Sequence, residues 1–343
     1  MRPKQKVTLK DIAKKLGVSV VTVSNSLAGR PGVSDEMRVK IRDAAISAGL
    51  DPEKYQKKKI LSEVPEGMTA KSIGVLVSER YMHVGKSMYW EMYQKTAYVI
   101  SRFKCFSSLI IVPDRSQKAD PPEIKGLDGI IIIGHIRDVM LKKILNNARC
   151  TVVFLDEQTH MGDYSAVLSG NYYGMYKATR ELVTAGHKEI GFVGALEYSG
   201  NIIDRYYGYK KCMRQNNLQV NPDYILSDRT GDDEEAKIVL PQKLPTAFAC
   251  SSDYAASILY DALRERGLNV PGDISLVGYD NYLYGSEIEM MLTTYNVDML
   301  RMAERAVSQV LKEIKDPAAS GEIIEIDSYI IRRESIKRCR NEK

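Results

Sequence analysis

From residue 71 onward, short apolar runs alternate with longer polar or amphipathic segments, and this alternation restricts the possible folds more than any other feature of the chain. The runs read SIGVLV, SSLIIV, GIIIIG and TVVFL in a first series, then EIGFVG, TAFAC and ISLVG in a second. Continuously apolar strands separated by helices such as ASILYDALRERG are typical of parallel sheets covered on both faces. Two successive series predict two lobes, each with a doubly wound sheet and with a ligand cleft at the carboxyl ends of the strands.

Charge is distributed unevenly along the 343 residues, whose formal net charge is +5. Residues 1–60 hold fourteen Lys and Arg against six Asp and Glu, whereas the rest of the chain holds 35 basic and 38 acidic residues. The positive excess therefore lies in the first sixth of the chain, which predicts an anion-binding head on a nearly neutral body. A solvated basic tail is the alternative, and it fails if this segment is folded.

Several function classes have no support in the sequence. The segment MRPKQKVTLKDIAKKLG lacks the apolar core of a secretory signal, and the longest apolar run, GIIIIG, is too short to span a bilayer. Five scattered cysteines show no metal-ligand spacing and are interpreted as reduced thiols. We therefore expect a cytoplasmic protein with no membrane span, no metal site and no cofactor.

Residues 8–48 have the pattern of three short amphipathic helices. The positions expected to face inward are Leu9, Ile12, Ala13 and Leu16 in the first helix, Val23 and Leu27 in the second, and Met37, Ile41, Ala44, Ala45 and Ala48 in the third. Thr8, Ser19 and Ser34 stand at the three N-cap positions, and Gly17 and Gly29 follow the first two helices. Three helices with a short turn between the first two form a helix-turn-helix, whose second helix enters the major groove of DNA.

The run VTLKDIAKKLGVSVVTVSNSLAG, followed by VSDEMRVKI, resembles the headpiece of the LacI/GalR family of transcriptional repressors. Further landmarks are GHKEIGFVG at 186–194, the MLTTYN stretch and IIRRES at 330–335, so the resemblance covers almost the whole chain. It implies an α-helical helix-turn-helix headpiece plus an α/β two-lobed core of periplasmic-binding-protein type, with doubly wound parallel sheets. It also implies a homodimer that binds a pseudo-palindromic double-stranded DNA operator under the control of a small molecule. We expect a sugar or sugar derivative as this effector, with a purine or other metabolite as the second class.

The resemblance also divides the chain. It implies a headpiece at 1–50, a hinge linker at 51–70 and a core at 71–343, in which lobe 1 takes about 71–167 and 298–323 and lobe 2 about 168–297 and 324–340. The linker departs from the family pattern, because Glu53 stands where an asparagine is expected and Lys59 lies near the position of the leucine that inserts into the minor groove. Leu61, two residues further on, is the candidate for that insertion.

The outward-facing residues of the second helix are the candidates for reading DNA. Val20 and Val21 are placed to touch thymine methyl groups and Asn25 to pair with an adenine edge, and the resemblance implies the same three positions. The alternative, that the two valines belong to the core, is weakened because Val23 and Leu27 already fill it. Further candidates for contact with DNA are Thr8, Ser19, Thr22 and Arg30, with Lys6, Lys10 and Arg38 for phosphates and Leu61 in the minor groove.

Polar residues next to predicted strands, together with one arginine and two aromatic residues, are the candidates for binding the effector. They are Tyr89, Trp90, Asp156, Arg205, Ser252, Asp253 and Asp280. We expect both Arg205 and Asp280 in loops that follow strands. Carboxylates with an arginine suit the hydroxyl groups of a sugar, and an aromatic ring covers its apolar face. The resemblance implies effector contacts at the same positions. Helix N-capping is the alternative for the aspartates, and for Asn171 capping is the favoured interpretation.

An enzyme and a solute-binding receptor are the alternative classes. The chain has only four histidines and no GxSxG, P-loop or HExxH motif, and the glycines of GFVGALEYSG lack dinucleotide-binding spacing. A receptor would need export. Turnover by the purified protein would favour the enzyme, secretion would favour the receptor, and salt-sensitive binding of duplex DNA would favour the regulator.

Overall fold

The computed structural model describes residues 8–27, 33, 37–38, 40–41, 44–45, 48, 50, 69–82, 87–113, 118–229, 238–282 and 284–339. The chain divides into two compact units, Met1–Thr69 and Ala70–Lys343. Arg30, Leu61 and almost all of the expected hinge linker lie outside the described residues.

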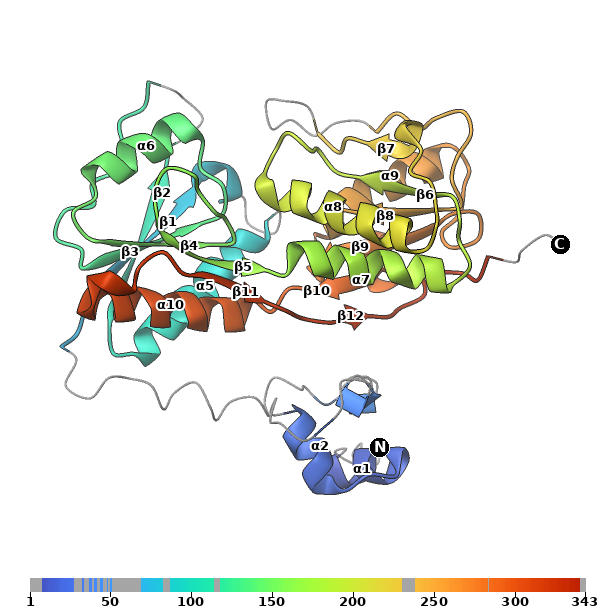
Figure 1. The fold of residues 1–343 in the computed structure, drawn as a ribbon, viewed down its shortest axis with the longest axis horizontal. Helices are drawn as coiled ribbons and strands as arrows, with labels where there is room; N and C mark the ends of the chain where they lie inside the picture. Colours follow the sequence, from blue (N-terminus) through green and yellow to red (C-terminus); the bar gives the residue numbers. More distant parts are fainter. Residues whose placement is uncertain are drawn as a thin grey trace, which may run out of the picture. The chain divides into compact units, whose positions relative to one another are not determined.

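The first unit contains a helix-turn-helix (Figure 1). Its helices are α1, Leu9–Leu16, and α2, Val20–Leu27. Gly17 ends α1 with φ of +66°, a left-handed conformation that residues with a side chain rarely adopt, and the Val18 amide donates to the Ala13 carbonyl at 3.0 Å. Ser19 Oγ then accepts from the Thr22 amide at 2.9 Å, which caps α2. These bonds define the turn that the sequence predicts.

The apolar residues of the first unit form one core. Its buried members are Ile12, Ala13, Val23, Leu27, Ile41, Ala44 and Ala45. All of them are residues that the helical spacing predicts to face inward, so that expectation is confirmed for the described positions. The basic segment is therefore folded where the structure describes it, and the alternative of a solvated tail is wrong.

The second unit is built around two six-stranded sheets (Figure 1). The strands are β1 Ser72–Ser78, β2 Phe106–Val112, β3 Gly129–Ile133, β4 Thr151–Leu155, β5 Ser165–Ser169, β6 Ile190–Val193, β7 Ile225–Leu226, β8 Ala247–Cys250, β9 Ser275–Asp280, β10 Thr293–Asn296, β11 Ile323–Ile326 and β12 Ile330–Ile331. The first sheet has the order β11-β5-β4-β3-β1-β2 and the second β12-β10-β9-β8-β6-β7. Every pairing is parallel except that of β12 with β10. We call the part around the first sheet lobe 1 and the part around the second lobe 2.

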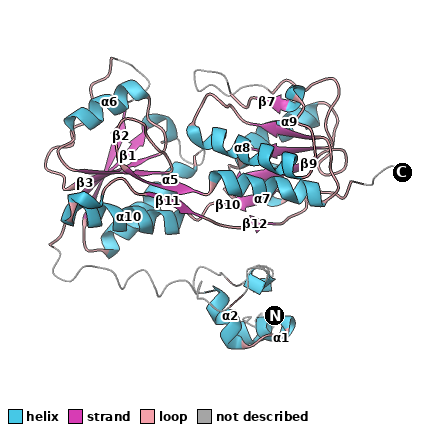
Figure 2. Cartoon of the chain, in the orientation of Figure 1, coloured by secondary structure: helices cyan, strands magenta, loops and turns pink. Residues whose placement is uncertain are grey.

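Helices cover both sheets (Figure 2). They are α5 Met88–Arg102, α6 Asp138–Asn147 and α10 Met299–Lys315 in lobe 1, and α7 Asn171–Thr184, α8 Gly200–Gln215 and α9 Asp253–Glu265 in lobe 2, with 3-10 helices η2 Glu79–Tyr81, η3 Pro222–Tyr224, η4 Glu287–Met290 and η5 Pro317–Ala319. The sequence prediction of doubly wound parallel sheets is confirmed. No helix in the described part is long and apolar enough to cross a membrane. All five cysteines are described, and none forms a disulfide.

The chain crosses between the lobes three times. It passes from β5 to α7 at Gly170, from β10 to α10 at 297–298, and from β11 to β12 at 327–329. The family resemblance implies crossovers near 168, 297 and 324. Because each lobe is assembled from separate stretches of sequence, residues that are distant along the chain meet where the two sheets face each other.

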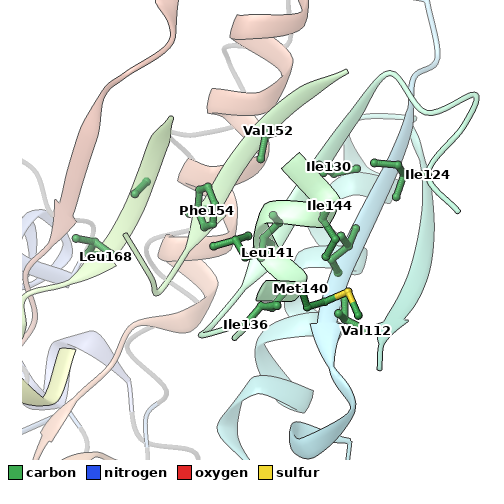
Figure 3. Packing of buried hydrophobic residues seen from close by; sticks show 13 residues of the cluster. Val112, Ile124, Ile130, Ile136, Met140, Leu141, Ile144, Val152, Phe154 and Leu168 are labelled. Carbon is green, nitrogen blue, oxygen red and sulfur yellow. The ribbon is translucent and has the colours of Figure 1, made fainter. Parts of the chain in front are cut away.

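Each lobe has its own apolar core. In lobe 1, β3, β4 and α6 enclose a buried cluster that includes Ile130, Phe154 and Ile144 (Figure 3). Lobe 2 has a matching cluster around Phe248 and Leu259. Except for SSLIIV, which forms the edge strand β2, the apolar runs noted in the sequence are thus central strands of the sheets. They hold the loops at their carboxyl ends in fixed positions.

Candidate functional site

Helix α2 presents its first residues to solvent. The side chains of Val20 and Val21 are 39% and 66% exposed, whereas Val23 and Leu27 are buried. The alternative that the first two valines belong to the core is therefore wrong. Asn25 is half-buried on the same helix. An exposed apolar pair followed by an amide has the groups that contact thymine methyls and an adenine edge.

The other described DNA candidates make bonds within the unit. Thr8 donates to Asp11 Oδ2 from its backbone nitrogen and from Oγ1, both at 2.8 Å, and these bonds lower the pKa of Asp11. Ser19 Oγ and Thr22 Oγ1 lie 2.8 Å apart at the start of α2. Arg38 donates from Nε to the Val33 carbonyl at 3.1 Å, which gives it a structural role. Lys10 is exposed on α1.

Five polar side chains from both lobes form a buried group that we call the interlobe network. Its members are Asp156, Asn171, Asn201, Arg205 and Asp280, and none is more than 7% exposed. Asp156 follows β4 in lobe 1, while Asp280 ends β9 in lobe 2. Asn171 begins α7, and Asn201 and Arg205 lie one turn apart on α8. The network therefore lies at the carboxyl ends of both sheets, where doubly wound folds bind ligands.

Hydrogen bonds join these side chains into a chain across the lobes. Arg205 Nε donates to Asn171 Oδ1 at 2.8 Å, Asn171 Nδ2 to Asn201 Oδ1 at 2.8 Å, and Asn201 Nδ2 to the Asp156 carbonyl at 2.7 Å. Arg205 Nη1 also donates to the Ser251 carbonyl at 2.8 Å and lies 3.6 Å from Asp280 Oδ1. Arg205 thus contacts several strand ends of lobe 2 and is linked through two amides to lobe 1.

Aromatic rings flank the interlobe network. The Arg205 guanidinium lies 3.8 Å from the centroid of the Tyr279 ring, and Tyr279 Oη donates to Ser169 Oγ at 3.2 Å. In lobe 1, Tyr89 Oη donates to Asp156 Oδ2 at 3.1 Å, and its ring is 4.4 Å from that of Tyr81. The rings exclude water and strengthen the charge interactions between them.

A close approach of two helices places Asn171 beside Arg205. A Cβ atom at Gly208 of α8 would lie 2.0 Å from the Tyr172 carbonyl of α7, so only glycine permits this spacing. The side chains of α8 that lie one turn before Gly208 consequently reach the first residue of α7. This packing fixes the orientation of the guanidinium.

The two carboxylates of the network are electrostatically unusual. Burial raises the pKa of Asp280 to about 7 and that of Asp156 to about 6, although nearby Arg205 opposes both shifts. Their backbones are also unusual, with φ of +112° at Asp280 and +61° at Asp156. Strained backbone of this kind at strand ends is common at ligand sites. Among the described side chains, Asp280 Oδ1 and Ser251 Oγ are buried without a hydrogen-bond partner, so a ligand hydroxyl has groups to pair with.

Replacing Asp280 by asparagine is expected to reduce the pH dependence of stability between about pH 4 and pH 7. The raised pKa of Asp280 means that the folded protein holds a proton that the unfolded chain releases near pH 3.8. The free energy of unfolding of the wild type should therefore fall as the pH rises through this window, and Asp280→Asn removes that contribution. Urea unfolding at several pH values measures it, with the surface change Asp261→Asn as control. Equal slopes in wild type and Asp280→Asn would contradict the assignment.

The structure separates the seven effector candidates into two groups. Four of them, Tyr89, Asp156, Arg205 and Asp280, come together in or against the interlobe network. Ser252 instead caps α9 by accepting from the Ala255 amide at 3.0 Å. Asp253 accepts from Thr294 Oγ1 at 2.6 Å and from the Tyr282 amide at 3.0 Å. These bonds connect the start of α9 to β10 and to the segment after β9. Trp90 packs against Tyr93 at 5.4 Å.

Two sequence interpretations are corrected. Arg205 lies within helix α8 and not in a loop after a strand. Asn171 is not an N-cap, because Gly170 takes that position and Asn171 Oδ1 accepts from Arg205. Sequence reasoning also missed Asn201. No helix was predicted over 200–215, so its i, i+4 spacing from Arg205, which places both on one face of α8, could not be used.

Comparison with known proteins gives consistent matches to both units. Residues 8–52 match the model of bacterial regulatory proteins of the lacI family, and residues 179–336 match the periplasmic binding protein-like domain. The HTH-type transcriptional repressor PurR of Histophilus somni is 28% identical over 340 residues, which cover 96% of this chain and 99% of the relative. PurR of Pasteurella multocida is 26% identical over 347 residues, with 96% and 98% covered.

Solved structures share the fold. A lac repressor dimer bound to operator and an anti-inducer has a TM-score of 0.62 at 22% identity, covering 97% of this chain and all of the other. A complex of the transcriptional regulator CelR with cellobiose has a TM-score of 0.64 at 18% identity, covering 96% and 99%. A regulator from Enterococcus faecium with bound ribose has a TM-score of 0.62 at 20% identity, covering 79% and 100%.

A helix-turn-helix with an exposed second helix, followed by two lobes that share a buried polar network, defines a transcriptional regulator with its own sensor domain. The two matched models together span more than half of this chain, and the relatives align along nearly their whole length. The chain belongs to the LacI family, whose members are DNA-binding transcription regulators.

Proposed function

We propose that this LacI-family chain is a homodimeric repressor, acting in the cytoplasm, whose affinity for a pseudo-palindromic operator is controlled by a small molecule bound at the interlobe network. Residues 1–50 read DNA, 51–70 form the hinge, and 71–343 bind the effector and dimerise. Within the core, lobe 1 comprises about 71–169 and 298–326, and lobe 2 about 171–297 and 330–339, which differs by a few residues from the bounds that the resemblance implies. The observation that supports this most strongly is the chain of hydrogen bonds from Arg205 through the side chains of Asn171 and Asn201 to the backbone carbonyl of Asp156. Because this chain links both lobes, a ligand that alters it can alter their relative position.

An exposed apolar surface on lobe 1 supports the homodimer. Tyr98 on α5 and Phe106 and Ile111 on β2 are 50%, 69% and 49% exposed. Strand β2 is also an edge strand of its sheet, with one side unpaired in the single chain. Exposed apolar residues along an open strand edge favour association, and a second copy would cover them. Sedimentation at micromolar concentration tests this, and a monomer there would contradict the homodimer.

The chemistry of the interlobe network favours a sugar or sugar derivative. Its two carboxylates, two amides and one guanidinium can each bind adjacent hydroxyl groups, and Tyr89 closes one side. A purine is the second candidate class, because the same amides and carboxylates can pair with ring nitrogens. A thermal-shift screen of the full-length protein against sugars, sugar phosphates and purines tests the proposal. Failure of all three classes to stabilise the protein would contradict it.

Asn25→Ala is expected to weaken operator binding by about 1–3 kcal/mol while leaving binding to random duplex nearly unchanged, because a base contact carries specificity. The operator is first selected from a random duplex library with the full-length protein. Affinities for that operator and for random DNA are then measured by fluorescence anisotropy.

Lys10→Ala is the matched control for the DNA measurement. The exposed Lys10 is a phosphate candidate, so its removal should weaken both complexes by a similar factor. If Asn25→Ala behaves in the same way as Lys10→Ala, then Asn25 does not read a base.

A further inference from the structure

Beside the interlobe network, residues of both lobes enclose a cavity of about 540 Å³. Lobe 1 contributes Arg80, His135 and Arg137, and lobe 2 contributes Arg229 and residues 194–198 and 225–227. This volume is in the range of small-molecule sites. None of the effector candidates from the sequence lines it, so it is a separate part of the cleft.

The cavity is connected to the network through aromatic rings. The Arg80 guanidinium lies 5.4 Å from the centroid of the Tyr81 ring and 6.0 Å from that of Tyr198. Tyr81 in turn packs at 4.4 Å against Tyr89, which donates to Asp156. The rings of Tyr81 and Tyr89 thus form a continuous contact from the arginine side of the cavity to the carboxylate of Asp156.

Arg229 is held in a fixed orientation at the wall of the cavity. Asp228, which is fully buried, accepts from Arg229 Nε at 3.2 Å and from Nη2 at 3.1 Å, and it also accepts from the Ala195 amide at 2.7 Å. The Tyr198 ring also packs against the guanidinium, with its centroid 4.1 Å from Arg229 Cζ. A guanidinium that is oriented before binding loses little entropy when it meets an anion.

The charges around the cavity favour an anion. Three arginines line it, against one lining carboxylate, Glu197. Asp228 offsets part of the charge of Arg229 from behind, and His135 Nδ1 lies 3.5 Å from Glu157 Oε2. The excess of positive charge is therefore confined to the side chains that line the cavity, because Asp228 and Glu157 lie behind that lining. The space is partly enclosed, and charge interactions there are stronger than in water.

We propose that this cavity binds the phosphate group of the effector, so that the effector is an organic phosphate whose uncharged part contacts the interlobe network. This inference rests on the proposed function. It specifies the chemical class of the effector, which the proposed function leaves open. Three guanidinium groups from separate elements match the three terminal oxygens of a phosphate ester. A carboxylate ligand has only two oxygens and would leave part of this set of donors unused. A phosphate contacted by arginines from both lobes also holds the lobes together.

The test uses the full-length protein. The first probe is inorganic phosphate, compared with NaCl at equal ionic strength in a thermal-shift assay. The second is calorimetry with the pairs glucose 6-phosphate and glucose, and inosine 5′-phosphate and inosine. Phosphate should raise Tm beyond the effect of NaCl, and a phosphorylated compound should bind at least about ten-fold more tightly than its neutral partner.

Variants assign the effect to the cavity. Arg137→Gln and Arg80→Gln should each reduce the affinity for phosphate about ten-fold or more. Arg264→Gln, which removes the same charge from an exposed ion pair with Glu287, should behave as the wild type. Because two variants are tested separately, misfolding of one leaves the other informative.

Several results would overturn the proposal. They are a phosphate response no larger than that of NaCl, an unchanged response in both cavity variants, or tighter binding of glucuronate than of glucose 6-phosphate. Binding of duplex DNA is measured in parallel. A protein that binds its operator but ignores phosphate contradicts only this inference, whereas one that binds phosphate but no duplex contradicts only the proposed function.

Discussion

Operator affinity is expected to fall by roughly three orders of magnitude or more between 50 and 200 mM salt, the loss typical of proteins that neutralise about six to ten phosphates. Residues 1–60 hold fourteen basic and six acidic residues, and a dimer brings two such segments to one duplex. Each neutralised phosphate releases counterions, so the logarithm of the association constant should fall with the logarithm of salt concentration with a slope of about −0.9 per phosphate. Fluorescence anisotropy on a labelled operator measures this slope.

Two lysines separate the contribution of the headpiece from that of the core. Lys10 is exposed on α1, and Lys142 is exposed on α6 of lobe 1. Lys10→Ala should reduce the slope by about 1 for each phosphate contact that is lost, whereas Lys142→Ala should leave it unchanged. A slope near zero in the wild type, or an equal change in the two variants, would show that headpiece charge does not drive binding.

Most of the main strands and the headpiece helices were predictable because their buried residues form continuous apolar runs or recur at helical spacing in the sequence. A run such as GIIIIG is continuously apolar, and β3 is buried at every residue. The two-residue strands β7 and β12, and β10 with its sequence TTYN, carry no such signal, since sheet pairing and not hydrophobicity selects them. Sequence patterns therefore predict the continuously apolar strands better than the short or polar ones.

The interlobe network was only partly predictable, for a different reason. Asp156 and Asp280 follow apolar runs, so their position at the strand ends could be inferred. Asn201 and Asn171 lie 30 residues apart and meet because Gly208 lets two helices approach closely. No local pattern indicates that contact. The arginines around the cavity are equally separate in sequence and become one site only through the fold.

The network and the cavity together explain how a ligand can act on both lobes. The network connects lobe 1 to lobe 2 through the side-chain amides of Asn171 and Asn201. A ligand hydroxyl that pairs with Asp280 or Ser251 would satisfy a polar atom that now has no hydrogen-bond partner. It would also lie close enough to Arg205 to change the hydrogen bonds that Arg205 makes. The relative position of the lobes then depends on occupancy, which is the coupling that effector control requires.

Arg205→Ala is expected to weaken effector binding about ten-fold or more and to destabilise the core by roughly 3–5 kcal/mol. The second effect arises because removing one member of a buried charge pair leaves the other without compensation, here Asp280 at 3.6 Å. The first arises because an unpaired ligand hydroxyl costs about 1–3 kcal/mol. Calorimetry with the ligand found in the screen measures affinity, and urea unfolding measures stability.

Asp280→Asn and the double variant distinguish a binding role from a structural one. If the Arg205–Asp280 pair contributes to stability, the double variant should be less destabilised than the sum of the single variants, because neither then leaves a buried charge behind. Effector affinity should still be lost in all three variants.

The headpiece is a separate unit, so effector-free operator binding should persist in each variant if the effector is an inducer. If it is a corepressor, operator binding should instead be lost when effector is present. Wild-type effector affinity in both single variants would remove Arg205 and Asp280 from the binding site and leave them as supports of the lobe 2 strand ends.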